Sequence, residues 1–280
     1  MSLASWLRTT IRSVLSPEQA QTLRRYQALH FRGLQHLVYR GLCGSNLRAL
    51  AQIYNSDKWG RHWYAQHYET HFRPLRRHKL TLLEIGIGGY DRPEDGGGSL
   101  RMWRTYFPQA QIVGIDIYDK RPHEERRIRT FRGSQVDAEF LDKVMKEIGP
   151  VDIIIDDGSH INEHILQTFD LLFPRLAPHG LYVIEDLQTA YWKTYGGTSG
   201  NEAHTPTSLT LLKNLVDGLH FAEYELPHYS PSYTDTHVVG LHFYHNIAFI
   251  QKGLNDEEGG TADLGRRMVF ASTSSESVVS

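Results

Sequence analysis

Cysteine, long apolar runs and an excess of basic charge are what this sequence lacks. Its single cysteine, Cys43, excludes an internal disulfide framework and is typical of proteins from a reducing compartment. No run approaches the ~18 consecutive apolar residues of a membrane-spanning helix, and the amino terminus lacks the apolar core of a secretory signal. The formal net charge of −2 leaves no basic excess to track a phosphate backbone. We therefore expect a cytoplasmic protein that spans no membrane and binds no nucleic acid.

What the chain does contain is ordinary for a folded α/β protein. Its 280 residues are 40% hydrophobic and 22% charged, which allows one large domain with additions. Residues 1–53 are predicted to form a helical amino-terminal appendage that covers the sheet or makes an oligomer contact, so we expect a homo-oligomer. Residues 54–253 carry the strands and helices of one α/β domain, and the polar residues 254–280 are predicted to be a flexible tail.

One stretch, residues 151–160, organises the rest of the chain. Its apolar start, Val151-Asp-Ile-Ile-Ile155, predicts a strand buried on both faces of a parallel sheet, and the sequence Asp-Asp-Gly-Ser-His follows at 156–160. A second apolar strand ends in Glu185 and Asp186. Open α/β sheets bind their ligands at the carboxyl ends of strands. Because adjacent acids repel unless a cation lies among them, a cation site is favoured over the alternative that each acid only caps the following helix.

A glycine-rich turn follows the first predicted strand, residues 80–85. The glycines at 86, 88 and 89 let the backbone approach a ligand closely, and Ser99 is expected to cap the next helix. The second strand ends in Asp116, which is placed to accept hydrogen bonds from both ribose hydroxyls. The polar loop 132–137 follows the third strand, and we expect an adenine base to bind there. These features predict an adenosine-containing cofactor.

The order of the elements predicts the topology. Five strands alternate with helices, and a terminal hairpin follows in which 238–244 and 247–250 are joined by His245 and Asn246. This predicts a Rossmann-like α/β fold whose seven-stranded sheet is mostly parallel, with an antiparallel terminal hairpin. A dinucleotide dehydrogenase would show a fuller Gly-x-Gly-x-x-Gly motif and a second mononucleotide-binding half. The hairpin in place of that half favours a class I methyltransferase that uses S-adenosylmethionine over an NAD enzyme.

Four motifs stand out: Leu83-Glu-Ile-Gly-Ile-Gly-Gly89, Gly114-Ile-Asp116, Ile155-Asp-Asp-Gly-Ser-His160 and Val183-Ile-Glu-Asp-Leu-Gln-Thr-Ala-Tyr-Trp192. Together they resemble the metal-dependent sugar O-methyltransferases of macrolide biosynthesis, of the mycinamicin and demethylmacrocin types. The last two motifs are specific, whereas a glycine turn alone is common. The resemblance covers most of the α/β domain. It extends to the mycobacterial sugar 1-O-methyltransferases of methylmannose polysaccharide synthesis, so 1-O-methylation of a methylated mannoside is one expected reaction.

The resemblance implies a division of labour among the site residues. Asp157, Glu185 and Asp186 would bind Mg²⁺, a hard cation that prefers oxygen ligands. His160 would be the general base that takes the proton of a sugar hydroxyl, and S-adenosyl-L-methionine would donate the methyl group. The other implied contacts are Glu84 and Gly86 with the amino-acid end of the cofactor, Asp116 with its ribose, and Ser134 and Gln135 with its adenine.

Several assignments have alternatives. His160 precedes a predicted helix and could cap it instead, and His164, one turn later, could be the base. Tyr64, Tyr191 and Trp192 either contact the sugar or the cofactor, or belong to the core. The alternative functions are an NAD-dependent sugar oxidoreductase and a non-catalytic nucleotide-binding module. Hydride transfer needs no group of carboxylates, and a pure binding module needs no general base, so the acids and the imidazole together argue against both.

Overall fold

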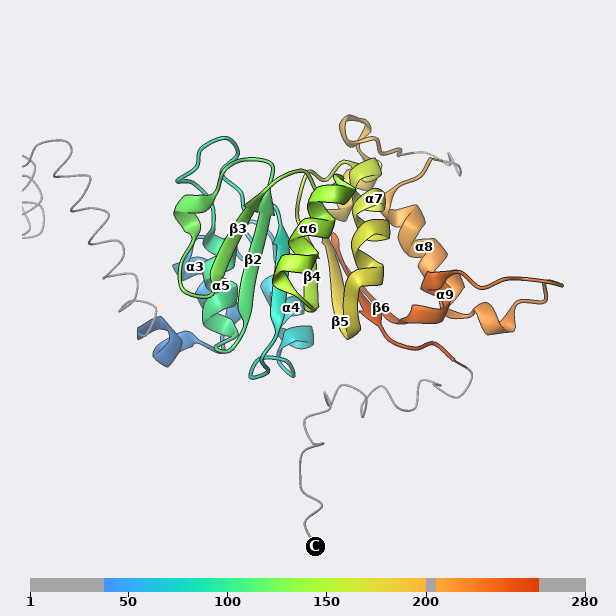
Figure 1. The fold of residues 1–280 in the computed structure, drawn as a ribbon, viewed down its shortest axis with the longest axis horizontal. Coiled ribbons are helices and arrows are strands. Elements are labelled where there is room, and N and C mark those ends of the chain that lie inside the picture. The colour runs from blue at the N-terminus through green and yellow to red at the C-terminus, as the bar shows by residue number, and fades with distance from the viewer. Residues whose placement is uncertain (1–37, 200–204, 257–280) are drawn as a thin grey trace, which may run out of the picture.

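The computed structural model describes residues 38–199 and 205–256, which form three layers with helices on both faces of one sheet (Figure 1). Of the expected appendage only 38–53 falls within these ranges, and of the expected tail only 254–256. The rest of both segments lies outside the described residues, so the division of the chain into three parts stays a prediction. None of the described helices is long and apolar enough to cross a membrane.

The sheet has seven strands in the order β3-β2-β1-β4-β5-β7-β6. Strands β1 to β5 pair in parallel, and β7 lies antiparallel between β5 and β6. The predicted fold, mostly parallel with an antiparallel terminal hairpin, is confirmed. The bounds are β1 Thr81–Ile85, β2 Gln111–Asp116, β3 Ile128–Arg132, β4 Val151–Asp156, β5 Leu176–Glu185, β6 Val238–Tyr244 and β7 Ile247–Lys252.

The helices are divided between the two faces of the sheet. In Figure 1, α6 and α7 stand in front of the sheet while α3 and α5 lie behind it. One core joins the sheet to α3 Leu47–Ile53, α4 Ala65–Phe72 and α5 Gly98–Tyr106, and the other joins it to α6 Ala138–Ile148, α7 Asn162–Leu172 and α8 Ser208–Leu219. The remaining elements are α9 Tyr233–His237 and the 3-10 turns η1 Arg121–His123, η2 Phe173–Arg175, η3 Leu187–Tyr191, η4 Lys193–Tyr195 and η5 Phe221–Glu223.

Strand β4 is buried on both faces, as its apolar sequence predicts. Ile153 and Ile155 belong to the core beside α3, α4 and α5, whereas Val151 and Ile154 belong to the core beside α6, α7 and α8. All four side chains are 0% exposed. Full burial of such a side chain contributes about 1.5–3 kcal/mol, so this strand is a rigid support. Only its carboxyl end is left to meet a ligand.

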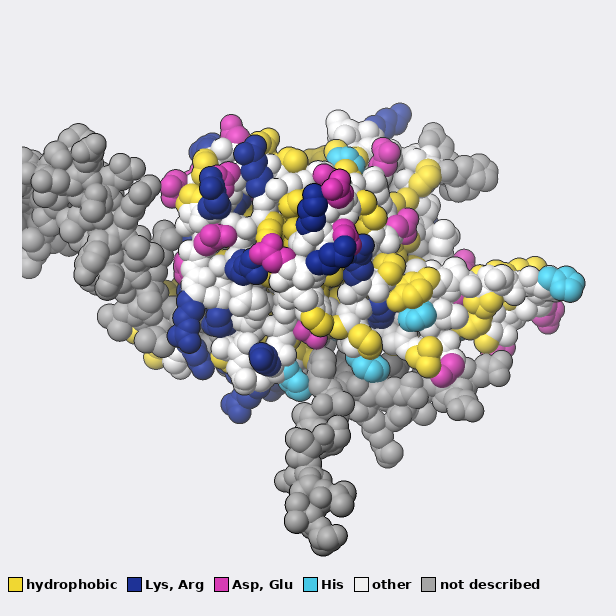
Figure 2. All heavy atoms as spheres, viewed as in Figure 1, with side chains coloured by type: hydrophobic (Ala, Val, Ile, Leu, Met, Phe, Trp, Pro, Cys, Tyr) yellow, Lys and Arg dark blue, Asp and Glu magenta, His cyan; other side chains and the backbone are white. Residues whose placement is uncertain are grey.

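The outer surface of α6 carries charges of both signs (Figure 2). Lys143 pairs with Glu139 at 2.9 Å, and Lys146 pairs with Asp142 at 2.7 Å, each one helical turn apart. Exposed ion pairs of this kind contribute little to stability because water and salt screen them. The placement of α6 therefore depends on its buried apolar face rather than on these surface pairs.

Asn162 connects the start of α7 to two other segments near the expected site. Its side-chain nitrogen donates to the carbonyl oxygens of Thr189 at 3.1 Å and Tyr195 at 2.9 Å. Its side-chain oxygen accepts a hydrogen bond from the backbone N–H of Ser208 at 2.8 Å. The residue is 1% exposed, so water cannot replace these bonds. Asn162 thereby fixes η3, which directly follows Asp186, against α7 and α8.

We predict that Asn162→Ala lowers the thermal stability of the protein. Each buried partner left without a hydrogen bond costs about 1–3 kcal/mol, and Asn162 has two buried partners and one half-buried partner. Thermal denaturation followed by circular dichroism measures the effect, with the exposed Lys143→Ala as the control expected to leave the melting temperature almost unchanged. Equal melting temperatures for the two variants would show that the hydrogen bonds of Asn162 do not stabilise the fold.

Candidate active site

The carboxyl ends of β1 and β4 meet where the strand order reverses, which is where open α/β sheets bind ligands. Ile85 lies in register with Asp156, and the N–H of Asp157 donates to the carbonyl of Ile85 at 3.0 Å. Gly86 follows with a φ of 89°, and a Cβ at this position would lie 2.1 Å from the carbonyl oxygen of Asp157. Only glycine fits here, so the glycine turn and the acidic turn lie directly side by side.

Asp116 lies at the end of β2, as its position in the sequence predicts. Its Oδ2 accepts a hydrogen bond from the N–H of Ile87 at 2.9 Å, and its Oδ1 accepts one from the N–H of Tyr118 at 2.9 Å. These bonds fix the glycine turn to the end of β2. The carboxylate is half-buried, and each oxygen keeps a lone pair that can accept a ribose hydroxyl. The arrangement fits the adenosine part of the expected cofactor.

Glu84 is fully buried inside β1. The hydroxyl of Ser99 donates to its Oε2 at 2.7 Å, and the ammonium of Lys58 lies 3.6 Å from its Oε1. Burial raises the pKa of Glu84 to about 7, although Lys58 opposes this. The predicted helix cap at Ser99 is wrong, because Gly97 is the residue that precedes α5 and the Ser99 hydroxyl is used by Glu84. The contact of Glu84 with the cofactor stays a prediction, as does that of Gly86.

Gln135 supports the acidic turn. Its side-chain nitrogen donates to Asp156 Oδ1 at 3.2 Å and to Thr168 Oγ1 at 3.0 Å, and its oxygen accepts from the N–H of Ser159 at 2.8 Å. Gln135 is 8% exposed, and both ends of its amide are engaged by the protein. The neighbouring Ser134 is half-buried. The contact of both residues with an adenine base stays a prediction.

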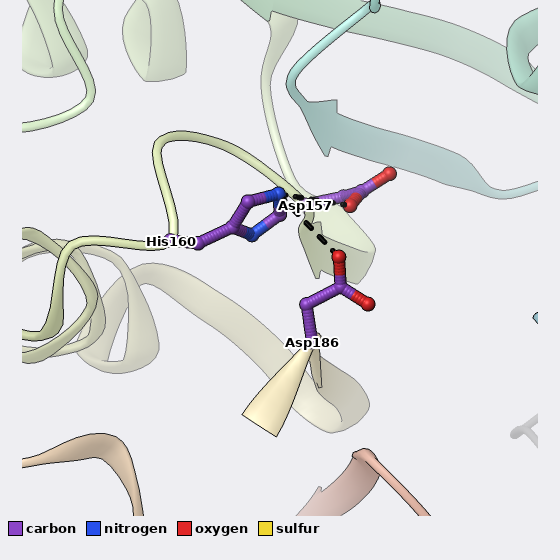
Figure 3. A group of neighbouring side chains, drawn as sticks. All are labelled: Asp157, His160 and Asp186. Atoms are coloured by element: carbon purple, nitrogen blue, oxygen red, sulfur yellow. Dashed lines mark ion pairs between the residues drawn. The ribbon is translucent and has the colours of Figure 1, made fainter. Parts of the chain in front are cut away.

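Asp157, His160 and Asp186 form an open cluster of side chains at this edge (Figure 3). His160 Nε2 lies 3.6 Å from Asp186 Oδ2 and 3.9 Å from Asp157 Oδ1. All three side chains are half-buried, and one donor atom from each lies within 4.8 Å of the others. His160 and Asp186 also have positive φ angles, 58° and 53°. Such backbone strain in residues other than glycine gathers at functional sites.

The structure separates the alternatives for the two histidines. The residue that caps α7 is Ile161, whose side chain makes no cap hydrogen bond, so His160 does not cap this helix. His164 Nδ1 is hydrogen-bonded to the hydroxyl of Ser159 at 2.9 Å. Of these two histidines, His160 is the one that shares a cluster with Asp157 and Asp186.

Asp186 receives a second set of contacts from the loop before α4. The hydroxyl of Tyr64 donates to its Oδ1 at 2.7 Å, and His62 Nδ1 lies 3.7 Å from the same oxygen. Burial alone would raise the pKa of Asp186. The hydrogen bond from Tyr64 and the charges of His160 and His62 outweigh burial, so the pKa is lowered. Asp186 is therefore held as a carboxylate. The Tyr64 ring is 3% exposed, so this residue meets the site through its hydroxyl, and its contact with substrate stays a prediction.

Glu185 faces a different environment from its neighbour Asp186. It is 2% exposed, and its oxygens lie 2.8 and 3.0 Å from Lys58 Nζ. The Tyr68 hydroxyl donates a very short hydrogen bond to its Oε1. Burial and the nearby Asp157 raise the pKa of Glu185 well above its usual range. The structure thus brings Asp157 and Asp186 to the open cluster and places Glu185 behind them.

Two residues of the site, Lys58 and His62, were not found by sequence reasoning. Both lie in the segment 54–64, whose aromatic and polar composition is typical of a binding-site wall. That signal identifies the segment but not the side chains. Tyr191 and Trp192 are 53% and 49% exposed just beyond Asp186, so they are rim residues rather than core.

The donor set fits a divalent cation of the Mg²⁺ type. Mg²⁺ is bound by oxygen ligands and keeps several positions for water or substrate. Asp157 and Asp186 offer half-buried carboxylates that face a common space, and the turn of Gly86 adjoins them. A cofactor in the glycine turn and a cation at the acids would therefore occupy neighbouring positions.

Comparisons with known proteins agree with this geometry. No family model matches the sequence. The chain is 52% identical over 222 residues to the mycinamicin VI 2''-O-methyltransferase of Micromonospora griseorubida, a match that covers 78% of this chain and 56% of the relative. It is 53% identical over 218 residues to the demethylmacrocin O-methyltransferase of Streptomyces fradiae, covering 76% of this chain and 55% of the relative. The chain thus spans about half the length of the curated relatives it matches.

A solved structure matches the fold and the sequence together. MycE, a methyltransferase from the mycinamycin biosynthetic pathway in complex with Mg and SAH, aligns with a TM-score of 0.74 at 52% identity, over 76% of this chain and 55% of that one. The chain is a homologue of the macrolide-type sugar O-methyltransferases. MycE has also been solved with Mg, SAH and mycinamycin VI. The predicted resemblance to the mycinamicin and demethylmacrocin types and the predicted fold class are confirmed, and the matched relatives are O-methyltransferases rather than NAD enzymes.

We predict that Asp116→Ala weakens the binding of S-adenosylhomocysteine at least tenfold, because it removes the acceptor for the ribose and frees the glycine turn. Isothermal titration calorimetry measures the affinity. Asp119→Ala is the matched control, because this nearby acid pairs with the exposed Arg121 and should leave the affinity unchanged. Equal affinity of both variants for S-adenosylhomocysteine would contradict the prediction that Asp116 binds the ribose.

Proposed function

We propose that this protein is an S-adenosylmethionine-dependent and Mg²⁺-dependent O-methyltransferase that acts on a sugar hydroxyl of a glycoside, oligosaccharide or glycosylated natural product. The observation that carries the proposal is the open cluster of Asp157, His160 and Asp186 beside the glycine turn. It places an imidazole and two oxygen ligands next to a turn that fits an adenosine cofactor. The O-methyltransferases that are 52% and 53% identical to this chain support the same reaction.

In this proposal some residues of the chain hold the cation and the methyl donor, and another removes the proton of the sugar hydroxyl. Asp157 and Asp186, with Glu185 behind them, would hold the cation, and the glycine turn with Asp116 would hold the methyl donor. When bound, Mg²⁺ would make the hydroxyl more acidic, and S-adenosylmethionine would supply an activated methyl group. Neither group replaces the need for a proton acceptor, which the chain itself must provide.

His160 accepts that proton at Nε2, the atom that faces both carboxylates. A positioned base is needed because a sugar hydroxyl is a poor nucleophile at neutral pH. As the proton leaves, the hydroxyl oxygen forms its bond to the methyl carbon, and the electron pair of the carbon–sulfur bond returns to sulfur. Asp186 holds the imidazole in place from one side, while Tyr64 holds Asp186.

The acceptor sugar lies, in this proposal, between the open cluster and the rim aromatics Tyr191 and Trp192. Exposed aromatic rings suit the apolar faces of sugar rings, and two adjacent hydroxyls suit the open positions of Mg²⁺. A methylated mannoside, as in polysaccharide synthesis, is one such acceptor. We further propose that the protein is cytoplasmic, because it has a single cysteine, and that it is a homo-oligomer, because residues 1–53 show a helical pattern. The mass measured by light scattering tests the proposed oligomer.

We predict that the protein transfers a labelled methyl group from S-adenosylmethionine to a glycoside acceptor only when Mg²⁺ is present. Chelation with EDTA should abolish the transfer, and added Mg²⁺ should restore it. His160→Ala should lower the single-turnover rate by roughly 10²–10⁴-fold, the usual contribution of a positioned base. Metal and cofactor affinity should persist in this variant, because neither depends on the imidazole.

His164→Ala is the matched control for this experiment. It removes an imidazole one turn further along, whose Nδ1 is engaged by Ser159, and should leave turnover per folded molecule nearly unchanged. Full transfer after exhaustive chelation would contradict the role of the cation. Near-normal turnover in a stably folded His160→Ala protein would contradict the role of the base.

A further inference from the structure

Lys58 lies at the centre of the acids that end the middle strands of the sheet. The residue is 0% exposed in the loop before α4. Its ammonium lies 2.7 Å from Asp157 Oδ2, 2.8 Å from Glu185 Oε1 and 3.6 Å from Glu84 Oε1. These acids come from β4, β5 and β1, which are neighbours in the sheet. A single buried cation therefore spans three adjacent strand ends.

The two oxygens of Asp157 are used in different directions. Oδ2 accepts a hydrogen bond from Lys58 Nζ, whereas Oδ1 is the oxygen nearest to His160, at 3.9 Å. A carboxylate held by one oxygen cannot rotate freely about its last bond. The contact with Lys58 thereby keeps Oδ1 facing the open cluster, where it is available to a cation.

Glu185 is held even more tightly. Its Oε2 accepts from Lys58 at 3.0 Å, and its Oε1 accepts from the hydroxyl of Tyr68. Two carboxylates this close repel strongly in a buried setting, and removing the cation between them leaves a charge without a partner. Lys58 thus keeps Asp157 and Glu185 together, and Tyr68 keeps Glu185 aimed at Lys58.

We propose that Lys58 is a positioning residue for the metal site: with Tyr68 it holds Asp157 and Glu185 in the arrangement that binds a divalent cation. The inference rests on the proposed function, because it concerns the same cation. Lys58 does not itself ligate a metal, since its ammonium has donors only. It acts through the carboxylates that it orients, as residues behind a metal site commonly do.

The test is the affinity of the purified protein for Mg²⁺ alone, measured by isothermal titration calorimetry without cofactor or acceptor. Lys58→Met keeps the length of the side chain but removes its charge and its hydrogen bonds. We expect the affinity for Mg²⁺ to fall by about 10–100-fold, the usual effect of losing a residue that orients metal ligands.

Lys252→Met is the matched control. Lys252 is also a buried lysine, 5% exposed, but its ammonium donates to the carbonyl oxygens of Phe173, Pro174 and Leu176. It makes no contact with the acid cluster through these bonds. The same substitution therefore removes a buried ammonium and lowers stability, while the affinity for Mg²⁺ stays at the wild-type value.

Tyr68→Phe is a second variant that tests the same set of contacts around Glu185 if Lys58→Met does not fold. It removes only the hydroxyl that donates to Glu185, and the ring keeps its buried packing against Phe72 and Trp103. We expect a smaller but measurable loss of Mg²⁺ affinity. A thermal melt of each variant shows that the titrated protein is folded.

The outcomes are distinguishable. A folded Lys58→Met protein that binds Mg²⁺ as tightly as wild type, or more tightly, overturns the inference and leaves the proposed function intact. If that variant does not fold, unchanged Mg²⁺ affinity in Tyr68→Phe overturns it. A wild-type protein that shows no Mg²⁺ binding overturns the proposed function and this inference together. Weaker binding in both variants, with Lys252→Met unchanged, supports the inference.

Discussion

The register between β1, β4 and β5 is the constraint on which the site depends. Ile85 pairs with Asp156, and Asp156 pairs with Ile184, so three adjacent strands end at the same level. The residues that follow are the glycine turn at 86, the acidic turn at 157 and the acid pair at 185–186. Since the strands are held by burial on both faces, the glycine turn and the acidic turn are forced into contact.

Concentrating acids in this way creates an electrostatic problem that the fold resolves in two layers. In the inner layer, burial raises the pKa values of Glu84 and Glu185, and Lys58 supplies the compensating charge. In the outer layer, Tyr64 and nearby imidazoles lower the pKa of Asp186. Asp186 therefore stays ionised at the open edge of the sheet, while the inner acids Glu84 and Glu185 are held by contacts with the protein.

Much of the fold could be predicted from the sequence because its signals are local. The apolar run of β4, the Asp116 that ends β2 and the Asn246 hairpin turn each follow from a pattern a few residues long, and each lies where the pattern places it. Short patterns also predict that Asp157, His160 and Asp186 lie at one site, and the structure groups them there. Their grouping follows from the rule that ligands bind at the carboxyl ends of parallel strands.

What the sequence could not provide is the pairing of side chains across long separations. Lys58 lies 99 residues from Asp157 and 127 from Glu185 along the chain, and nothing in its local sequence indicates a buried ammonium. Ser99 shows the same limit, because a local rule predicts a helix cap whereas its hydroxyl bonds to Glu84 on β1. Short sequence patterns predict the secondary structure of the backbone, whereas tertiary contacts decide which polar partner each side chain binds.

The most direct test of the account is the position of a bound metal. Crystals of the protein soaked in Mn²⁺, which substitutes for Mg²⁺ at oxygen sites, give an anomalous diffraction signal from the metal itself. We predict a single strong peak bonded to the carboxylates of Asp157 and Asp186, beside His160. A peak elsewhere with this edge of the sheet empty, or no peak at saturating Mn²⁺, would contradict it.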